Sequence, residues 1–368
     1  EAYPDEPRYV VNQIELLITN EKFDEAEKLC EQLLKKDAHN PYAHLMLSEI
    51  YRAKGDLKRS NEKLKQAFAN RELEIDVKLG ILIGKVRQLP NKEIQEQCLE
   101  LGDILVKSHP TDSKAYAMNA DILVIAGKSK EALDQYIKSI RIDNSHFKIW
   151  QQIAILDYEL NQIDSLRIHT DQALELFPNQ SVLWFYNGLA HHLQKKYKKA
   201  TVSLEEGKKF IGDDKNLMVQ FNSVLGDSYH NLKDYKKSDE CFEEALKADA
   251  DNWVILNNYS YYLSLRKEKL EYARKMSEKV IREFPDNATY LDTYAWILYV
   301  MKDYKKAREM FEKIVDKTDN GTIIEHYGDV LYQLGEKDKA LEQWKKAKQS
   351  GETSDFIDRK ITDKKLYE

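Results

Sequence analysis

Glycine, proline and cysteine are scarce in this chain, and each scarcity excludes a class of protein. Of its 368 residues, 13 are Gly and 7 are Pro, while 33% are charged and 42% are hydrophobic. This composition excludes collagen-like and low-complexity chains and is typical of a helix-rich fold. No run of 18 apolar residues occurs, so the sequence offers no candidate membrane-spanning helix. The net charge of -6 argues against a general nucleic-acid binder, which needs a basic surface to displace counterions from phosphates.

Motifs for catalysis, metal binding or cofactor binding are also missing. The three cysteines, Cys30, Cys98 and Cys241, lie far apart without a C-x-x-C or Cys/His cluster, so we expect buried thiols rather than metal ligands. The sequence has no H-E-x-x-H, no G-x-S-x-G and no G-x-x-x-x-G-K-[ST]. It therefore predicts a protein that is not an enzyme and has no cofactor and no metal.

Residues 321–351 carry two helical patterns joined by a tight turn. The apolar and small side chains of each half share one helix face: Ile324, Tyr327, Gly328 and Leu331 in the first, and Ala340, Trp344 and Ala347 in the second. Gly335 interrupts the pattern between the halves, and Gly351 stands where glycine commonly follows a helix. The segment therefore predicts a helix-turn-helix unit.

This unit resembles the tetratricopeptide repeat, whose W-x2-L-G-x2-Y pattern is followed by A-x3-F and a second small residue. The small residue of the first helix recurs at intervals of about 34 residues over most of the chain, at Ser48, Ala120, Ala154, Gly188, Gly226, Ser260, Ala295 and Gly328. The resemblance implies an all-α fold, a right-handed α-α superhelix in which each repeat packs on its neighbours.

The register predicts about ten repeats between residues 7 and 353. They begin near Pro7, Pro41, Asp76, Ser113, Phe147, Ser181, Val219, Trp253, Ala288 and Gly321. The third lacks a clear small residue, so it is either a distorted repeat or a joint between two sub-arrays. Residues 1–6 are predicted to be a tail. Residues 354–368 are predicted to be a capping helix and tail, because a terminal repeat needs a polar-backed cap.

The resemblance implies that the first helices line a concave face that binds a protein or peptide. Carried onto this chain, the positions that point into the groove are Tyr158, Phe185, His192, Asp227, His230, Asn257, Tyr261, Asp292, Trp296, Tyr299, Glu325, Asp329 and Tyr332. Trp296 is a candidate binding anchor, because the packing positions of its helix are already filled by other side chains. The alternative is that neighbouring inner helices cover it.

Repeats of this family that hold a peptide carboxylate use Lys and Asn on successive first helices, and no lysine occupies those positions here. The predicted groove is aromatic and acidic, which favours a partner segment with basic or apolar side chains. The alternative function is an architectural subunit that acts through its ends or convex face, including self-association.

The last third of the chain resembles bacterial envelope proteins with these repeats. That resemblance favours a periplasmic protein or an outer-membrane-anchored lipoprotein and leaves the cytoplasm as the alternative.

Overall fold

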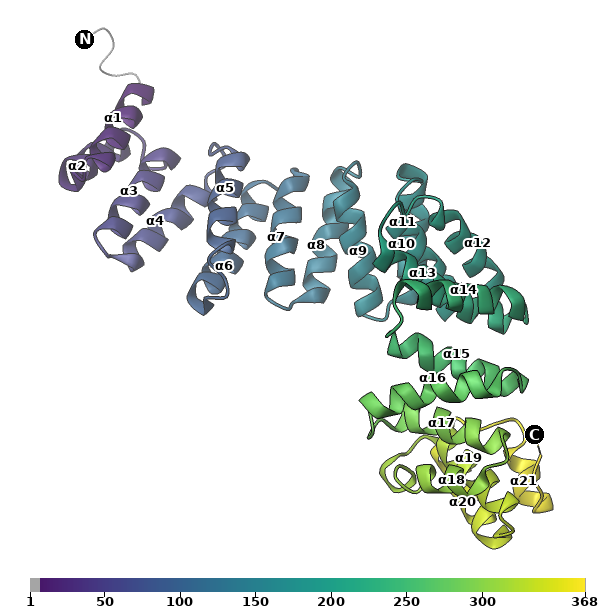
Figure 1. Ribbon diagram of the computed structural model, residues 1–368. Helices are drawn as coiled ribbons and strands as arrows, with labels where there is room; N and C mark the ends of the chain where they lie inside the picture. The colour runs from purple at the N-terminus through teal and green to yellow at the C-terminus, as the bar shows by residue number, and fades with distance from the viewer. Residues whose placement is uncertain (1–6, 368) are drawn as a thin grey trace. The chain divides into compact units, whose positions relative to one another are not determined.

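A computed structural model describes residues 7–367, so the predicted tail of residues 1–6 lies outside the described part of the chain. The described residues form 21 α-helices arranged as successive antiparallel pairs (Figure 1), which confirms the predicted all-α solenoid of helix-turn-helix repeats with a C-terminal capping helix. The chain divides into two compact units, residues 1–190 and 191–368, and the boundary falls within α11 rather than in the third pair.

Five helix pairs and the greater part of α11 belong to the first unit. In chain order the helices are α1 (Pro7–Thr19), α2 (Phe23–Lys36), α3 (Pro41–Ala53), α4 (Leu57–Ala69), α5 (Ile75–Val86), α6 (Lys92–Ser108), α7 (Ser113–Ile125), α8 (Ser129–Ile142), α9 (Phe147–Glu159), α10 (Ile163–Leu176) and α11 (Ser181–Leu193).

The second unit continues the same alternation and ends in a short single helix. Its helices are α12 (Tyr197–Lys208), α13 (Lys215–Asn231), α14 (Tyr235–Ala248), α15 (Trp253–Arg266), α16 (Leu270–Glu283), α17 (Ala288–Val300), α18 (Tyr304–Phe311), α19 (Gly321–Gln333), α20 (Lys337–Ser350) and α21 (Ile357–Asp363). A 3-10 turn, η1 (Val315–Lys317), follows α18. The helix α13 begins one turn before Val219, the residue near which the seventh repeat was expected, because Asp214 caps it by accepting the Leu217 N–H at 2.9 Å.

Asparagine caps start the three first helices on which the candidate site is built. The side chains of Asn252, Asn287 and Asn320 accept backbone N–H groups of α15, α17 and α19 at 3.2, 3.1 and 3.2 Å. Each bond satisfies one of the amides that a helix start leaves without an intrahelical acceptor, and such a cap contributes about 1 kcal/mol. These asparagine side chains therefore determine where α15, α17 and α19 begin.

Close crossing of the two helices in a pair explains the small residue in each first helix. A Cβ atom on Gly328 would lie 2.6 Å from the Trp344 ring, and one on Gly226 would lie 2.6 Å from the Phe242 ring. Both rings are fully buried, so they have little room to move away. The ring therefore takes the space that a side chain on the first helix would need.

The third pair, α5 and α6, is organised differently. Lys78 is completely buried, and its ammonium contacts the Phe68 and Asn70 carbonyl oxygens at 2.8 and 2.7 Å, as well as the Ser108 hydroxyl and the His109 ring. Burial lowers the Lys78 pKa to about 8. A polar cluster thus replaces the aromatic-on-glycine contact of the later repeats.

Candidate protein-binding site

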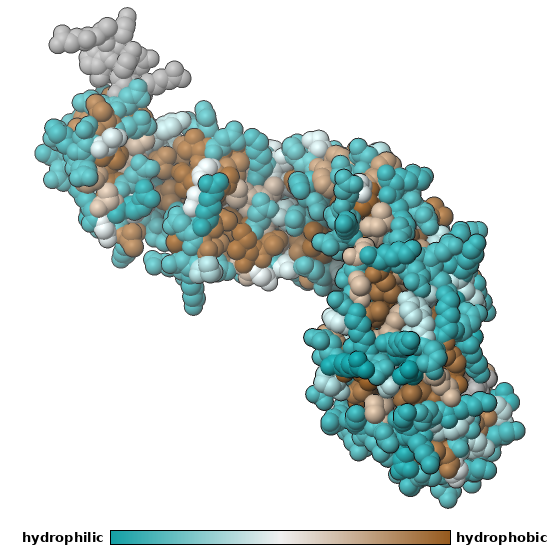
Figure 2. All heavy atoms as spheres, in the orientation of Figure 1, coloured by the Kyte–Doolittle hydropathy of each residue, from teal (hydrophilic) through white to brown (hydrophobic). Residues whose placement is uncertain are grey.

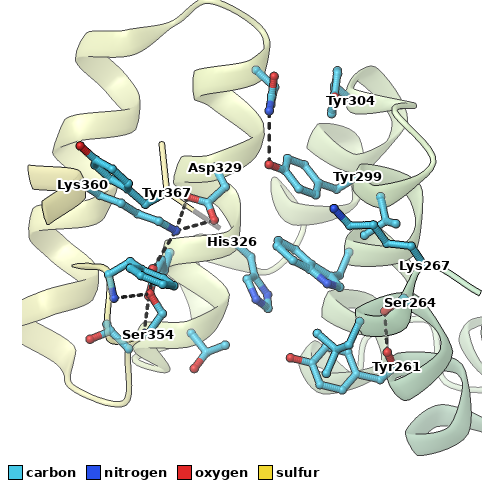
Figure 3. A pocket seen from close by; sticks show the side chains of 18 of the residues that line it. Tyr261, Ser264, Lys267, Tyr299, Tyr304, His326, Asp329, Ser354, Lys360 and Tyr367 are labelled. Atoms are coloured by element: carbon cyan, nitrogen blue, oxygen red, sulfur yellow. Dashed lines mark hydrogen bonds and ion pairs between the residues drawn. The ribbon is translucent and has the colours of Figure 1, made fainter. Parts of the chain in front are cut away.

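A pocket of about 1060 Å³ opens on the first helices of the second unit (Figure 3). Its walls come from α15, α17 and α19, from the turns after α15 and α17, and from the segment around α21. The lining residues are Tyr261, Ser264, Leu265, Lys267, Trp296, Tyr299, Val300, Lys302, Tyr304, Thr322, Glu325, His326, Asp329, Gln333, Thr353, Ser354, Phe356, Lys360 and Tyr367. The face of the molecule drawn in Figure 2 is mostly hydrophilic, with apolar patches among the polar side chains.

Stacked rings form one wall of the pocket. The Trp296 ring lies 4.7 Å from Tyr299 and 4.0 Å from His326, measured between ring centroids, with interplanar angles of 17° and 23°. His326 Nδ1 lies 2.8 Å from the Asp292 carboxylate. Burial opposes protonation of His326, but the charge and hydrogen bond of Asp292, together with the charges of Asp329 and Glu325, outweigh burial and raise the His326 pKa. The Trp296 indole N–H is buried and has no hydrogen-bond acceptor among the described residues.

A buried ion cluster forms the opposite wall. Lys360 Nζ lies 2.8 Å from Glu325 Oε1 and 2.8 and 2.7 Å from the two Asp329 oxygens. The Ser354 amide and hydroxyl donate to Glu325 at 2.8 and 2.5 Å, and Trp344 Nε1 donates to Asp329 at 2.8 Å. The side chains of Lys360, Glu325 and Asp329 are each only 3% exposed, so all three need these partners.

The carboxyl groups of this cluster respond differently to burial. Burial raises the Asp329 pKa to about 6, although Lys360 acts in the opposite direction. Burial also acts to raise the Glu325 pKa, but hydrogen bonds from Lys360 and Ser354 outweigh it and lower that pKa. Lys360 contacts both groups, so one positive charge from within the chain partly offsets the two carboxylates of this wall.

Five of the predicted site residues meet in this pocket: Tyr261, Trp296, Tyr299, Glu325 and Asp329. Three others lie on the same helices, α15, α17 and α19, but do not line it. Asp292 contacts the His326 ring and orients it. The Tyr332 ring stacks on the Trp344 ring with centroids 5.6 Å apart. Asn257 is buried beside Asn258.

A second group of predicted residues gathers around α13. The His230 ring stacks on Tyr262 with centroids 3.7 Å apart, and His192 Nδ1 lies 2.8 Å from the Ser228 hydroxyl. Burial lowers the His192 pKa and lowers the His230 pKa to about 4, whereas it raises the Asp227 pKa to about 6. One carboxylate oxygen of Asp227 is buried without a hydrogen-bond donor among the described residues.

The remaining predicted residues, Tyr158 and Phe185, belong to the first unit. The Tyr158 side chain is 45% exposed and its ring lies 6.1 Å from that of Tyr186. Phe185 is buried, with its ring 5.4 Å from Tyr186. Only Tyr158 of this pair presents a broad surface to a partner.

Among the lining residues that reasoning from the sequence missed, four have basic side chains: His326, Lys360, Lys267 and Lys302. Lys360 could have been found, because it interrupts the apolar stripe formed by Ile357 and Ile361. His326 and the two turn lysines gave no such signal, since their positions in the repeat are usually polar and solvated.

The sequence profile of the tetratricopeptide repeat matches residues 17–71 and 219–252. Residues 17–71 and 219–252 are thus similar to tetratricopeptide repeats. A solved tetratricopeptide repeat protein from Parabacteroides merdae is 13% identical, has a TM-score of 0.54 and covers 68% of this chain and 98% of its own. The fold of a chain in the Cut9-Hcn1 complex is similar at 11% identity and a TM-score of 0.50, covering 96% of this chain and 76% of that chain.

Curated proteins with similar tetratricopeptide repeats are subunits of larger assemblies. BBSome complex member BBS4 of Bos taurus is 24% identical over 266 residues, which is 70% of this chain and 49% of that protein. The NatA auxiliary subunit N-alpha-acetyltransferase 16 of Mus musculus is 21% identical over 196 residues, which is 43% of this chain and 22% of that protein. This chain thus spans about half or less of these relatives.

Two features are absent from residues 7–367, the described part of the chain. None of the helices described there is both long and apolar enough to cross a bilayer. Within the same residues, no three His, Cys, Asp or Glu side chains are grouped as they would be around a metal ion.

Proposed function

We propose that this tetratricopeptide repeat protein is a non-enzymatic scaffold that binds a segment of a partner protein on its first helices. The observation that carries the proposal is the aromatic pocket on α15, α17 and α19, in which the indole N–H of Trp296 is buried without an acceptor. Aromatic side chains in a concave, largely desolvated site are the usual anchors of protein recognition.

Asp227 and His230, on α13 of the same unit, extend the proposed surface. Tyr158, in the first unit, is proposed separately as an exposed contact residue. Each is a polar or aromatic group on a first helix, which is the type of residue that fixes the register of an extended partner.

A second candidate is an architectural subunit that works through its ends or convex face, including self-association, for example in a bacterial envelope assembly. The names of the relatives, a BBSome member and an auxiliary subunit, favour membership of a complex. They describe those proteins, and the envelope setting comes only from the resemblance of the last third of this sequence.

Affinity capture from the native extract separates these two functions. Replacing Trp296 and Tyr261 by Ala should abolish capture of the partner, because both pocket anchors are lost, while the helical circular dichroism spectrum stays unchanged. The matched control replaces Tyr235 and Tyr272 by Ala; these rings are 37% and 38% exposed on second helices of the same unit. Undiminished capture by the pocket variant, or equal loss in both variants, would contradict binding in the pocket.

A further inference from the structure

The pocket wall formed by α19 and α21 carries more negative than positive charge. Glu325 and Asp329 contribute two buried carboxylates, and Asp292 contributes a third against the His326 ring. Among the described residues, Lys360 and His326 are the basic groups that contact them. Burial raises the Asp329 pKa to about 6, so this carboxyl is mostly ionised at pH 7. Even when His326 is protonated, three negative charges therefore face two positive ones.

His326 presents an unused nitrogen to the pocket. The residue is only 8% exposed, and it lines the pocket from the middle of α19. Its Nδ1 lies 2.8 Å from the Asp292 carboxylate, whereas its Nε2 has no hydrogen-bond partner among the described residues. A neutral His326 that donates Nδ1–H to Asp292 keeps a lone pair on Nε2. The pocket thus offers an acceptor for an N–H group beside a wall that lacks a positive charge.

Phe356 adds a ring to the same end of the pocket. It is 37% exposed, it belongs to the lining, and its ring has no aromatic or cationic partner in the described part of the chain. Phe356 stands two residues after Ser354, whose amide and hydroxyl donate to Glu325. Aromatic faces near carboxylates are a common setting for ammonium and guanidinium groups.

The lysines in the turns of the pocket lie at its other end. Lys267 and Lys302 occupy turn positions equivalent to Gly335, with φ values of 58°, 65° and 84°. Gly335 follows Glu325 by ten residues, which corresponds to about 15 Å along a helix. This separation exceeds the screening length of about 8 Å at physiological ionic strength. In Figure 3, Lys267 lies across the pocket from Asp329. These exposed lysines therefore do little to offset the charge at Glu325.

Resting on the proposed function, we infer that the pocket binds a basic segment of the partner, and that one lysine or arginine of this segment places its cation between the Phe356 ring and the Glu325 end of α19. The cation supplies the positive charge that the wall lacks and donates an N–H to His326 Nε2. Its alkyl stem and neighbouring apolar side chains of the segment contact Trp296 and Tyr261. The basic preference that the sequence predicts for the whole groove is thereby assigned to one end of this pocket.

Selection from a phage-displayed library of random dodecapeptides on the immobilised full chain at pH 7.5 tests this inference. The enriched peptides should carry Lys or Arg beside an apolar residue. Synthetic copies with acetyl-lysine or citrulline at that position lose the charge, and their affinity, measured by fluorescence anisotropy, should fall about tenfold or more. Binding should also weaken as salt is raised. It should weaken at pH 5.5 as well, because His326 and Asp329 both take up protons and make the wall less negative.

Two threonines of the C-terminal segment provide matched variants of the protein. Thr353 lines the pocket, so Thr353→Lys adds a competing cation while the buried ion cluster keeps all its members. Affinity for the basic peptides should fall about tenfold. Thr362 is exposed on α21 and does not line the pocket, so Thr362→Lys should change the affinity by less than about twofold. Equal effects of the two variants would overturn the placement of the cation.

The outcomes separate the inference from the proposed function. Enrichment of acidic or uncharged peptides that still require Trp296 would overturn the basic preference and leave binding in the pocket intact. Equal affinities for the charged peptides and their acetyl-lysine or citrulline copies would do the same. Peptides that match this chain's own sequence would make a second copy the occupant and would also overturn it. An absence of enrichment, or binding that survives replacement of Trp296 and Tyr261 by Ala, would overturn both.

Discussion

The glycines of this array differ in whether helix packing requires them. Gly328 is needed because the Trp344 ring crosses its helix within contact distance of where a Cβ would lie. Gly80 lies in the interior of α5, yet a Cβ there would meet nothing within 4 Å. The same residue type is therefore a packing requirement at one position and only a cost in chain entropy at the other.

Replacing each glycine by alanine should shift stability in opposite directions. Gly328→Ala should destabilise by roughly 1–3 kcal/mol through overpacking against Trp344, whereas Gly80→Ala should stabilise by about 0.5–1 kcal/mol, since alanine is the better helix former. Urea unfolding followed by circular dichroism measures both. Equal shifts of the two midpoints would refute the packing role of Gly328.

Asp227 is a buried acid whose environment is unfavourable for its charge. Burial raises its pKa from 3.8 to about 6, and one of its oxygens is unpartnered. An acid with a raised folded pKa contributes stability that is complete below the unfolded pKa and is lost as the pH rises through the folded pKa. The charged form at neutral pH is therefore a cost to the fold, as is common at binding sites.

Replacing Asp227 by Asn should remove this cost. The variant should be more stable than the parent by roughly 1–3 kcal/mol at pH 7, and the difference should vanish towards pH 4. Thermal or urea unfolding at several pH values measures the difference, with the exposed Asp213→Asn as control. A difference that does not change between pH 4 and pH 7 would show that the Asp227 charge is not the cause.

At the scale of elements, α21 depends on tertiary contacts for its existence. A helix of seven residues is too short to persist alone in water. Ile357 packs into the last core cluster and Lys360 enters the buried ion cluster, whereas the Lys348–Asp358 pair is exposed and contributes little. The capping helix is therefore held by one buried charge and a small apolar contact.

Removing that charge should release the cap. Lys360→Met leaves Glu325 and Asp329 buried without a cation, which costs about 3–5 kcal/mol, and hydrogen exchange should accelerate across residues 354–367. Adding Glu325→Gln and Asp329→Asn to the same variant should restore much of the protection, because the uncompensated charges are gone.

The exposed Lys364→Met is the matched control for that experiment. Unchanged protection of α21 in the Lys360 variant would mean that apolar packing alone holds the cap. If Glu325→Gln and Asp329→Asn do not restore the protection from hydrogen exchange, the loss would be due to the missing packing of the lysine side chain itself.

At the scale of the whole molecule, the sequence predicts the fold better than the site. Spacing near 34 residues, asparagine caps and glycines opposite aromatic rings are local signals, and they suffice to predict helix pairs. The ion cluster joins Lys360 of α21 to Glu325 and Asp329 of α19 across the intervening helix α20, and no local sequence pattern predicts such a pairing. Trp296 was recognised because its helix had no packing position left for it, but its stacking on His326 depends on the adjoining repeat. Whether these residues bind a partner stays a prediction.

The cap also governs how such an array can lengthen by duplication of repeats. A further helix pair stacked directly on α20 would take the place of α21 and would remove Lys360 from Glu325 and Asp329. Two buried carboxylates would then lose their counter-charge at once, so a duplication at this end would fold poorly unless the new unit brought a cation to the same spot. An insertion between α17 and α19 would meet a similar barrier, because it would separate Asp292 from His326. Duplication of repeats is thus constrained wherever a buried charge pair joins neighbouring helices.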